Sequence, residues 1–170
     1  GVNDPNDPRR WNRLFVNNGS NSYSDLAATY GVQNKEQSWA SDFADIDNDG
    51  DLDLLTVNHS TTAQLFLNNG SGTYTNATTG SGLEFSNFFL QSKCEDLDND
   101  GFIDLLCVEG NYYFHNNGNG TFTRIQTLLP HPTTSHVLHS FALGDMNHDG
   151  GEQGYRFSRP LPEAEFRAWA

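Results

Sequence analysis

The stretch "DIDNDGDLDLL" at residues 45–55 places aspartates at alternating positions around a glycine and ends in an apolar run. Carboxylates this close repel one another, which raises their pKa values and destabilises a compact chain unless a cation lies among them. The same arrangement returns as "DLDNDGFIDLL" at residues 96–106. The sequence therefore predicts two cation-binding loops.

Each loop has aspartates at its positions 1, 3, 5 and 9 and glycine at position 6. Oxygen ligands on a flexible loop suit Ca²⁺, which takes about six to eight oxygens. Position 7 would contribute only its backbone carbonyl, so its side chain can vary, and it is Asp51 in one loop and Phe102 in the other. The predicted calcium ligands are Asp45, Asp47, Asp49, Asp51 and Asp53 in the first loop, and Asp96, Asp98, Asp100, Phe102 and Asp104 in the second.

Other interpretations of the loops fit less well. An EF-hand needs a bidentate glutamate at position 12 and flanking helices, whereas position 12 is Thr56 or Cys107 and the flanks are predicted strands. Mg²⁺ demands stricter octahedral geometry. A simple acidic surface turn would not be expected to recur in full. We therefore expect Ca²⁺ as the bound cofactor.

A third loop, "DMNHDGGEQ" at residues 145–153, departs from the pattern. It keeps Asp145, Asn147 and Asp149, but position 9 is Gln153. No apolar strand is expected after it. The sequence leaves a third calcium site open.

The whole chain repeats with the same step as the loops. The loops begin at residues 45, 96 and 145, which are 51 and 49 residues apart. An Asn-Asn-Gly motif begins at residues 17, 68 and 116, and Gly31-Val32 is echoed by Gly82-Leu83. A period near 50 indicates a repeat architecture.

Each repeat contains four short segments with strand character and no convincing helix. The first runs into the acidic loop, and the second, "LDLLTVN" or "IDLLCVE", is apolar enough to be covered on both faces. The third ends at Asn-Asn-Gly, whose residues tolerate the positive φ of a tight turn, and the fourth is rich in aromatic and β-branched residues. We predict an all-β fold made of β-propeller blades with four antiparallel strands each.

The repeats divide the chain into two complete units and two partial ones, and a propeller needs about four to eight blades to close. We therefore expect a partial propeller that packs against the remaining blades of a longer protein. The expected segments are a linker (1–10), the second half of a blade (11–37), two complete repeats (38–87 and 88–135), the start of a third (136–150) and a divergent or foreign tail (151–170).

Charge and composition limit the possible partners. The formal net charge is −13, which argues against nucleic acid or anionic lipid as a ligand. No apolar run reaches the length of about 20 residues that a membrane span needs, so we expect no membrane insertion.

The cysteines, Cys94 and Cys107, flank the second loop. If Asp96 pairs with Asp104, Cys94 lies nearly opposite residue 106 or 107, and the sequence allows either a disulfide or two buried thiols.

The loops and hairpins together resemble one known family. The segments "FADIDNDGDLDLL", "EDLDNDGFIDLL", "LFLNNGSGTYT" and "YYFHNNGNGTFT" are similar to the FG-GAP or VCBS repeat of integrin alpha chains and many secreted bacterial proteins. The resemblance implies that Ca²⁺ binds between the first two strands of a blade and that the loop carboxylates are its ligands. It also implies an extracellular, secreted or cell-surface protein that serves adhesion or ligand binding.

Three functions are compatible with this resemblance. The first is a non-catalytic, calcium-stabilised segment whose parent protein binds a protein or carbohydrate ligand. The second is an accessory part of a secreted carbohydrate-active enzyme, such as a polysaccharide lyase, with catalytic residues elsewhere. The third is a spacer without a ligand. The aspartates are better explained as metal ligands than as catalysts, so we expect no enzyme activity from this segment.

Overall fold

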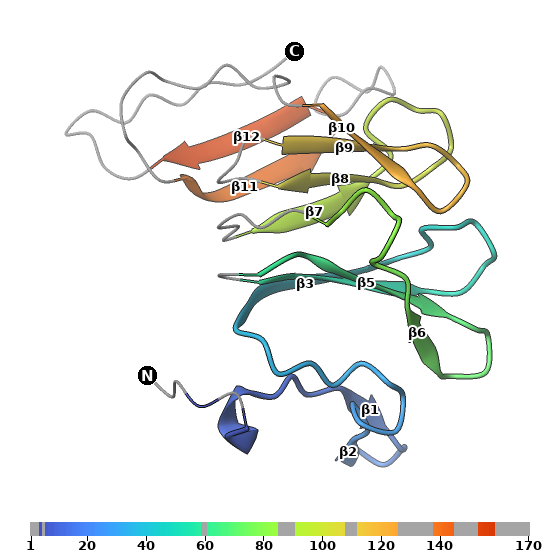
Figure 1. Ribbon diagram of the computed structural model, residues 1–170, viewed down its shortest axis with the longest axis vertical. Helices are drawn as coiled ribbons and strands as arrows, with labels where there is room; N and C mark the ends of the chain where they lie inside the picture. Colours follow the sequence, from blue (N-terminus) through green and yellow to red (C-terminus); the bar gives the residue numbers. More distant parts are fainter. Residues whose placement is uncertain are drawn as a thin grey trace.

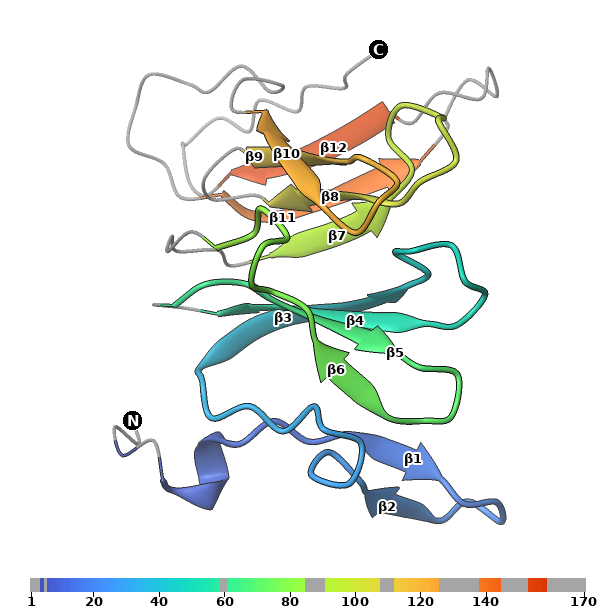
Figure 2. The same cartoon turned by 45° about the vertical axis from the view of Figure 1, so that its right-hand side comes forward.

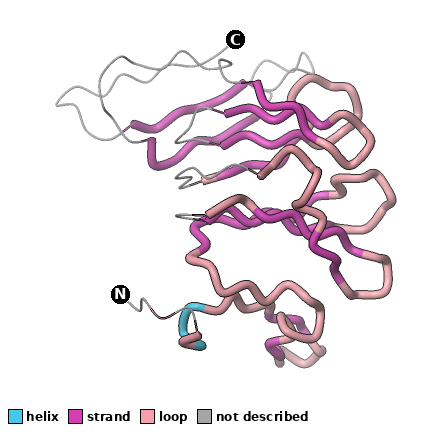
Figure 3. Tube along the Cα trace, in the orientation of Figure 1, coloured by secondary structure: helices cyan, strands magenta, loops and turns pink. Residues whose placement is uncertain are grey.

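The computed structural model describes residues 4, 6–58, 61–84, 91–107, 112–125, 138–144 and 153–158. These residues form twelve strands and one short 3₁₀ helix, η1 (Pro8–Arg10). Figure 3 shows how little of the trace is helical. The all-β prediction is therefore confirmed.

Two four-stranded antiparallel sheets dominate the fold, and each follows chain order. Sheet 1 contains β3 (Ser38–Ala44), β4 (Asp53–Asn58), β5 (Gln64–Asn68) and β6 (Tyr74–Asn76). Sheet 2 contains β7 (Ser92–Glu95), β8 (Asp104–Cys107), β9 (Tyr112–Asn116) and β10 (Phe122–Ile125). Four antiparallel strands per repeat were predicted, and the structure confirms them.

Two smaller sheets lie at the ends of the chain. The pair β1 (Phe15–Asn17) and β2 (Tyr23–Asp25) repeats the register of β5 and β6. β11 (Leu138–Gly144) pairs with β12 (Gln153–Ser158). An apolar strand was not expected after the third loop, and β12 is a strand without an apolar run. The tail segment lacks the apolar run of the earlier repeats, but its alternating aromatic residues favour a strand and its backbone pairs along β11.

The sheets are stacked. Figures 1 and 2 show the β1–β2 pair, sheet 1 and sheet 2 following one another in chain order, with the acidic loops and the Asn-Asn-Gly turns on one side. Within the described ranges the stack is open and does not close into a ring. The only helix in that part of the chain is far too short to cross a membrane.

The core explains why the second strand of each repeat is continuously apolar. Every residue of β4 and β8 is buried. Leu55 and Val57 belong to a core cluster shared with sheet 2, whereas Leu54 belongs to a second cluster with Ala27 and Val32 on the side of β1 and β2. β4 is thus covered on both faces, as the sequence predicted.

The Asn-Asn-Gly turns form as expected, but their asparagines do not adopt the positive φ that the sequence suggested. Gly70 and Gly118 have positive φ, whereas the asparagines before them do not. Instead, Asn68 and Asn116 accept a hydrogen bond from the backbone N–H of these glycines through their side-chain oxygens, at 3.2 and 3.0 Å. The asparagines therefore stabilise the turn as side-chain acceptors.

Both cysteines are free and buried. The expected pairing of Asp96 with Asp104 is wrong, because Glu95 is the residue opposite Asp104. This one-residue difference places Leu105 opposite Cys94 and Ser92 opposite Cys107. The two thiols are therefore not cross-strand partners.

A glycine in each inter-repeat segment lets the chain pass close to the next outer strand. The Ser81 carbonyl accepts a hydrogen bond from the Phe122 N–H at 2.7 Å, and the Tyr30 carbonyl accepts one from the Tyr74 N–H at 2.8 Å. The following residues, Gly31 and Gly82, have φ of +80° and +85°. A Cβ atom at Gly82 would overlap the Phe122 carbonyl oxygen. The recurring glycine is therefore a packing requirement.

We predict that Gly82→Ala destabilises the chain more than Gly80→Ala. Gly80 has a similar φ of +83° but open space around its Cβ position, so alanine there costs roughly 1–2 kcal/mol of left-handed strain. The overlap at Gly82 should add about 1–3 kcal/mol. Urea unfolding of both variants checks this. If both variants lost the same free energy of unfolding, the close approach of Gly82 to Phe122 would be unimportant for stability.

We also predict that neither cysteine reacts with a thiol reagent at pH 8 while the chain is folded. Burial raises the pKa of Cys94 to about 12 and raises the pKa of Cys107 as well, so almost no thiolate forms. Mass spectrometry after treatment with iodoacetamide should find both thiols modified only in denaturant. Rapid labelling of the native chain would contradict the buried positions.

Candidate metal centres

The two acidic loops have the same backbone conformation. Asn48 and Asn99, at position 4, both have φ of +58°, and Gly50 and Gly101, at position 6, have φ of +93° and +91°. Asparagine and glycine are the residues that adopt this left-handed region most readily. The sequence therefore determines a turn that brings the aspartates on either side of it together.

Position 1 holds this turn with its carboxylate. Asp45 accepts hydrogen bonds from the Asp49 and Gly50 N–H groups at 3.0 and 3.1 Å. In the second loop, Asp96 accepts them from Asp100 and Gly101 at 3.2 and 2.9 Å. The two loops thus repeat the same hydrogen bonds as well as the same residues.

Position 9 connects three parts of each repeat. Asp53, at the start of β4, is fully buried and accepts hydrogen bonds from the Ile46 N–H at 2.9 Å and from the Asn68 N–H at 2.8 Å. Asp104 accepts the equivalent bonds from Leu97 at 3.1 Å and Asn116 at 2.8 Å. One carboxylate therefore fastens the loop to both the second and the third strand.

The structure brings most of the predicted ligands together. In the first loop, Asp45, Asp47 and Asp53 offer oxygens that lie within 4.8 Å of one another. The second loop gives one such group of Asp96, Asp98 and Asp100, and another that combines Asp98 and Asp104 with His115. Asp49 is exposed, and its carboxylate accepts a hydrogen bond from the Asp51 N–H at 2.9 Å.

The two position-7 side chains point toward the neighbouring Asn-Asn-Gly turn. A Cβ atom at Gly70 would lie 2.7 Å from Asp51 Oδ2, and one at Gly118 would lie 2.6 Å from Phe102 Cζ. That position 7 would offer a cation only its backbone carbonyl stays a prediction. The third candidate set, Asp145, Asn147 and Asp149, lies outside the described residues.

Burial and mutual repulsion act on the grouped carboxylates. Burial raises the pKa of Asp53 and of Asp104, and the hydrogen bonds that these carboxylates accept from backbone N–H groups oppose the shift. The pKa of Asp47 is raised first by burial and then by the charges of Asp53 and Asp49. A bound cation would offset both effects, so the donor set fits a hard divalent cation such as Ca²⁺.

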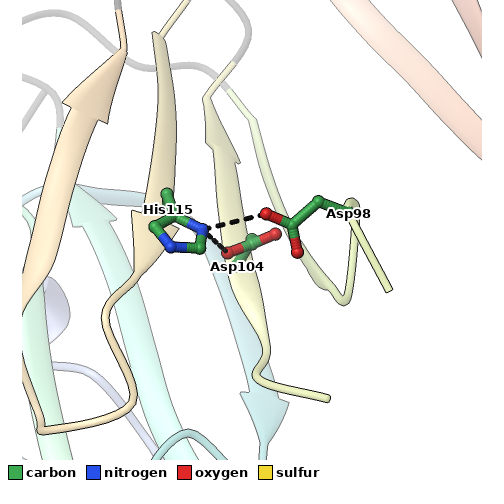
Figure 4. Close-up of side chains that lie close together, drawn as sticks. All are labelled: Asp98, Asp104 and His115. Carbon is green, nitrogen blue, oxygen red and sulfur yellow. Dashed lines mark ion pairs between the residues drawn. The ribbon is translucent and has the colours of Figure 1, made fainter. Parts of the chain in front are cut away.

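The sequence reasoning missed two residues beside the second loop. Tyr113 donates a hydrogen bond to Asp104 Oδ2 at 2.9 Å, and His115 Nδ1 lies 3.1 Å from Asp98 Oδ2. Figure 4 shows the imidazole directed at the two carboxylates. Both residues lie on β9, where the first repeat has Leu65 and Leu67. Aligning the third strands by their Asn-Asn-Gly ends would have identified them.

The two loops also contact each other across the sheets. The Asn48 side chain donates a hydrogen bond to the Gly101 carbonyl at 2.9 Å. The buried Asn116 side chain donates to the Ile46 carbonyl at 2.8 Å, although 70 residues separate them. The candidate metal centres are therefore part of the contact between consecutive repeats.

We predict that Asp53→Ala destabilises the metal-free chain strongly. The buried N–H groups of Ile46 and Asn68 would lose their acceptor, at a cost of about 1–3 kcal/mol each. Asp49→Ala is the control. Water can replace the Asp49 carboxylate as the acceptor for the Asp51 N–H in the exposed loop, so this variant should lose less than about 1 kcal/mol of the free energy of unfolding. Urea unfolding in excess chelator measures both. Similar losses would contradict the role of Asp53 as a structural acceptor.

Comparison with known proteins agrees with the repeat found in the structure. The family described as the FG-GAP-like repeat matches three overlapping segments, residues 2–56, 45–107 and 96–151. A search of curated proteins found no match. Together the matches cover most of the 170 residues, and their boundaries coincide with the acidic loops. The chain belongs to the FG-GAP-like repeat family.

Proposed function

We propose that this chain is a calcium-binding segment of a secreted or cell-surface protein and that Ca²⁺ fixes its acidic loops. The observation that carries the proposal is that the same loop occurs twice. In each copy, a buried aspartate at position 9 connects the loop to two strands by hydrogen bonds. Carboxylates that repel one another at such a point need a counter-ion.

The oxygen ligands would come from the residues that the sequence indicated. Asp45, Asp47, Asp49 and Asp53 would bind Ca²⁺ in the first loop, and Asp96, Asp98, Asp100 and Asp104 in the second. Asp51 and Phe102 would contribute backbone carbonyls. Several carboxylates around a flexible loop are the ligand set that Ca²⁺ prefers over Mg²⁺.

The stacked sheets would serve as blades of a β-propeller whose remaining blades complete the ring. The buried second strands and the open stack support this arrangement. The role of the whole would be adhesion or binding of an extracellular protein or carbohydrate, without catalysis. The grouping of the carboxylates around shared centres supports metal binding for them rather than acid and base catalysis.

We expect Ca²⁺ to bind at about two sites per chain and to raise the Tm, because a ligand that binds only the folded state stabilises it. Calorimetric titration and thermal melts, each in Ca²⁺ and in chelator, measure this. Asp47→Ala and Asp98→Ala should each remove one site, and the double variant should remove both.

Glu36→Ala is the matched control, because it removes one negative charge outside both loops. It should leave the stoichiometry at two. A folded wild-type chain whose Tm does not respond to Ca²⁺ would contradict the proposal, as would equal losses of affinity in the loop variants and the control.

A further inference from the structure

In the part of the chain that the structure describes, the second loop has a nitrogen donor beside it and the first loop does not. His115 comes from β9, not from the loop, and its side chain is about three-tenths exposed. Its Nδ1 lies 3.1 Å from Asp98 Oδ2 and 3.5 Å from Asp104 Oδ1, as Figure 4 shows. Its Nε2 lies 3.9 Å from Asp100 Oδ2. The imidazole is therefore close to two carboxylates of the loop and to the carboxylate at the start of β8.

The distances match those between ligands that share one transition metal ion. With metal–ligand bonds of about 2.0–2.2 Å, neighbouring ligand atoms in tetrahedral or octahedral sites lie roughly 3.0–3.5 Å apart. The contacts from His115 Nδ1 to the two aspartates lie in this range. One histidine and two carboxylates suit Zn²⁺, Co²⁺ or Mn²⁺, whereas Ca²⁺ favours oxygen ligands alone.

Further contacts hold this donor set in place. The Tyr113 hydroxyl is buried and donates to Asp104 Oδ2 at 2.9 Å, and it lies 3.3 Å from Asp98 Oδ2 and 3.4 Å from His115 Nδ1. The Asn116 N–H donates a hydrogen bond to Asp104 Oδ1 at 2.8 Å. Such outer hydrogen bonds orient metal ligands and strengthen binding.

The first repeat supplies an internal comparison. The register places Leu67 opposite Thr75, and it places His115 opposite Thr123 at the equivalent point of sheet 2. Leu65 stands where sheet 2 has Tyr113. The same backbone therefore offers an all-oxygen site in one repeat and a mixed nitrogen and oxygen site in the next.

We propose that Asp98, Asp104 and His115 form a site for a transition metal ion of the Zn²⁺ class, which the first loop cannot form. The proposal rests on the calcium function only in that Asp98 and Asp104 would be shared by both ions. Zn²⁺ would then displace Ca²⁺ from the second loop and leave the first loop unaffected. The two repeats would respond to different metals.

Titration with Co²⁺, followed by visible absorption, tests the site directly because the ligand-field bands report on the donor atoms. The wild-type chain should bind one Co²⁺ with high affinity. His115→Leu, which installs the residue of the first repeat, should weaken this binding by at least about tenfold and change the spectrum. Leu67→His, the reverse exchange, should add a second Co²⁺ with similar bands.

Parallel Ca²⁺ titrations separate this proposal from the calcium function. His115→Leu should still bind Ca²⁺ at about two sites. Co²⁺ binding that depends on His115 supports the mixed site even where Ca²⁺ does not bind. Identical Co²⁺ affinity and spectra for the wild type and His115→Leu would overturn it and leave His115 as an ion-pair partner of Asp98.

Discussion

The structure depends on one buried carboxylate in each repeat. Asp53 and Asp104 are fully buried, and each accepts one hydrogen bond from the start of its loop and another from the end of the third strand. A buried charge is costly unless it is hydrogen-bonded and neutralised. The backbone supplies the hydrogen bonds, and the proposed cation supplies the neutralising charge. The proposed cation and the hydrogen bonds that assemble each sheet would thus share one carboxylate.

This constraint extends from one repeat to the next. The Ile46 N–H donates a hydrogen bond to Asp53, and the Ile46 carbonyl accepts one from the Asn116 side chain. Two residues further along the loop, the Asn48 side chain donates a hydrogen bond to the Gly101 carbonyl of the second loop. Ordering of one loop by a cation would therefore also order the surface on which the neighbouring loop rests. Consecutive repeats are thus joined by hydrogen bonds on the side of the stack that carries the acidic loops.

The sequence alone was enough to predict the strands and the loops, because the 51-residue step repeats both the apolar runs and the glycines that permit left-handed turns. The sequence was insufficient wherever one repeat differs from the others. The tail strand β12 lacks the apolar run, so only its pairing with β11 reveals it. The cysteine register failed because Glu95, not Asp96, faces Asp104. His115 follows a short aromatic segment, and only the structure shows that its imidazole lies beside Asp98 and Asp104 of the second loop.

Amide hydrogen exchange, measured by mass spectrometry in chelator and in saturating Ca²⁺, tests the central claim most directly. If a cation neutralises the buried aspartates, Ca²⁺ should slow exchange most in peptides that cover residues 45–53 and 96–104 and the third-strand ends that bind Asp53 and Asp104. Peptides from β1 and β2 should change least. Unchanged exchange in both acidic loops, in a chain that is folded, would contradict the account.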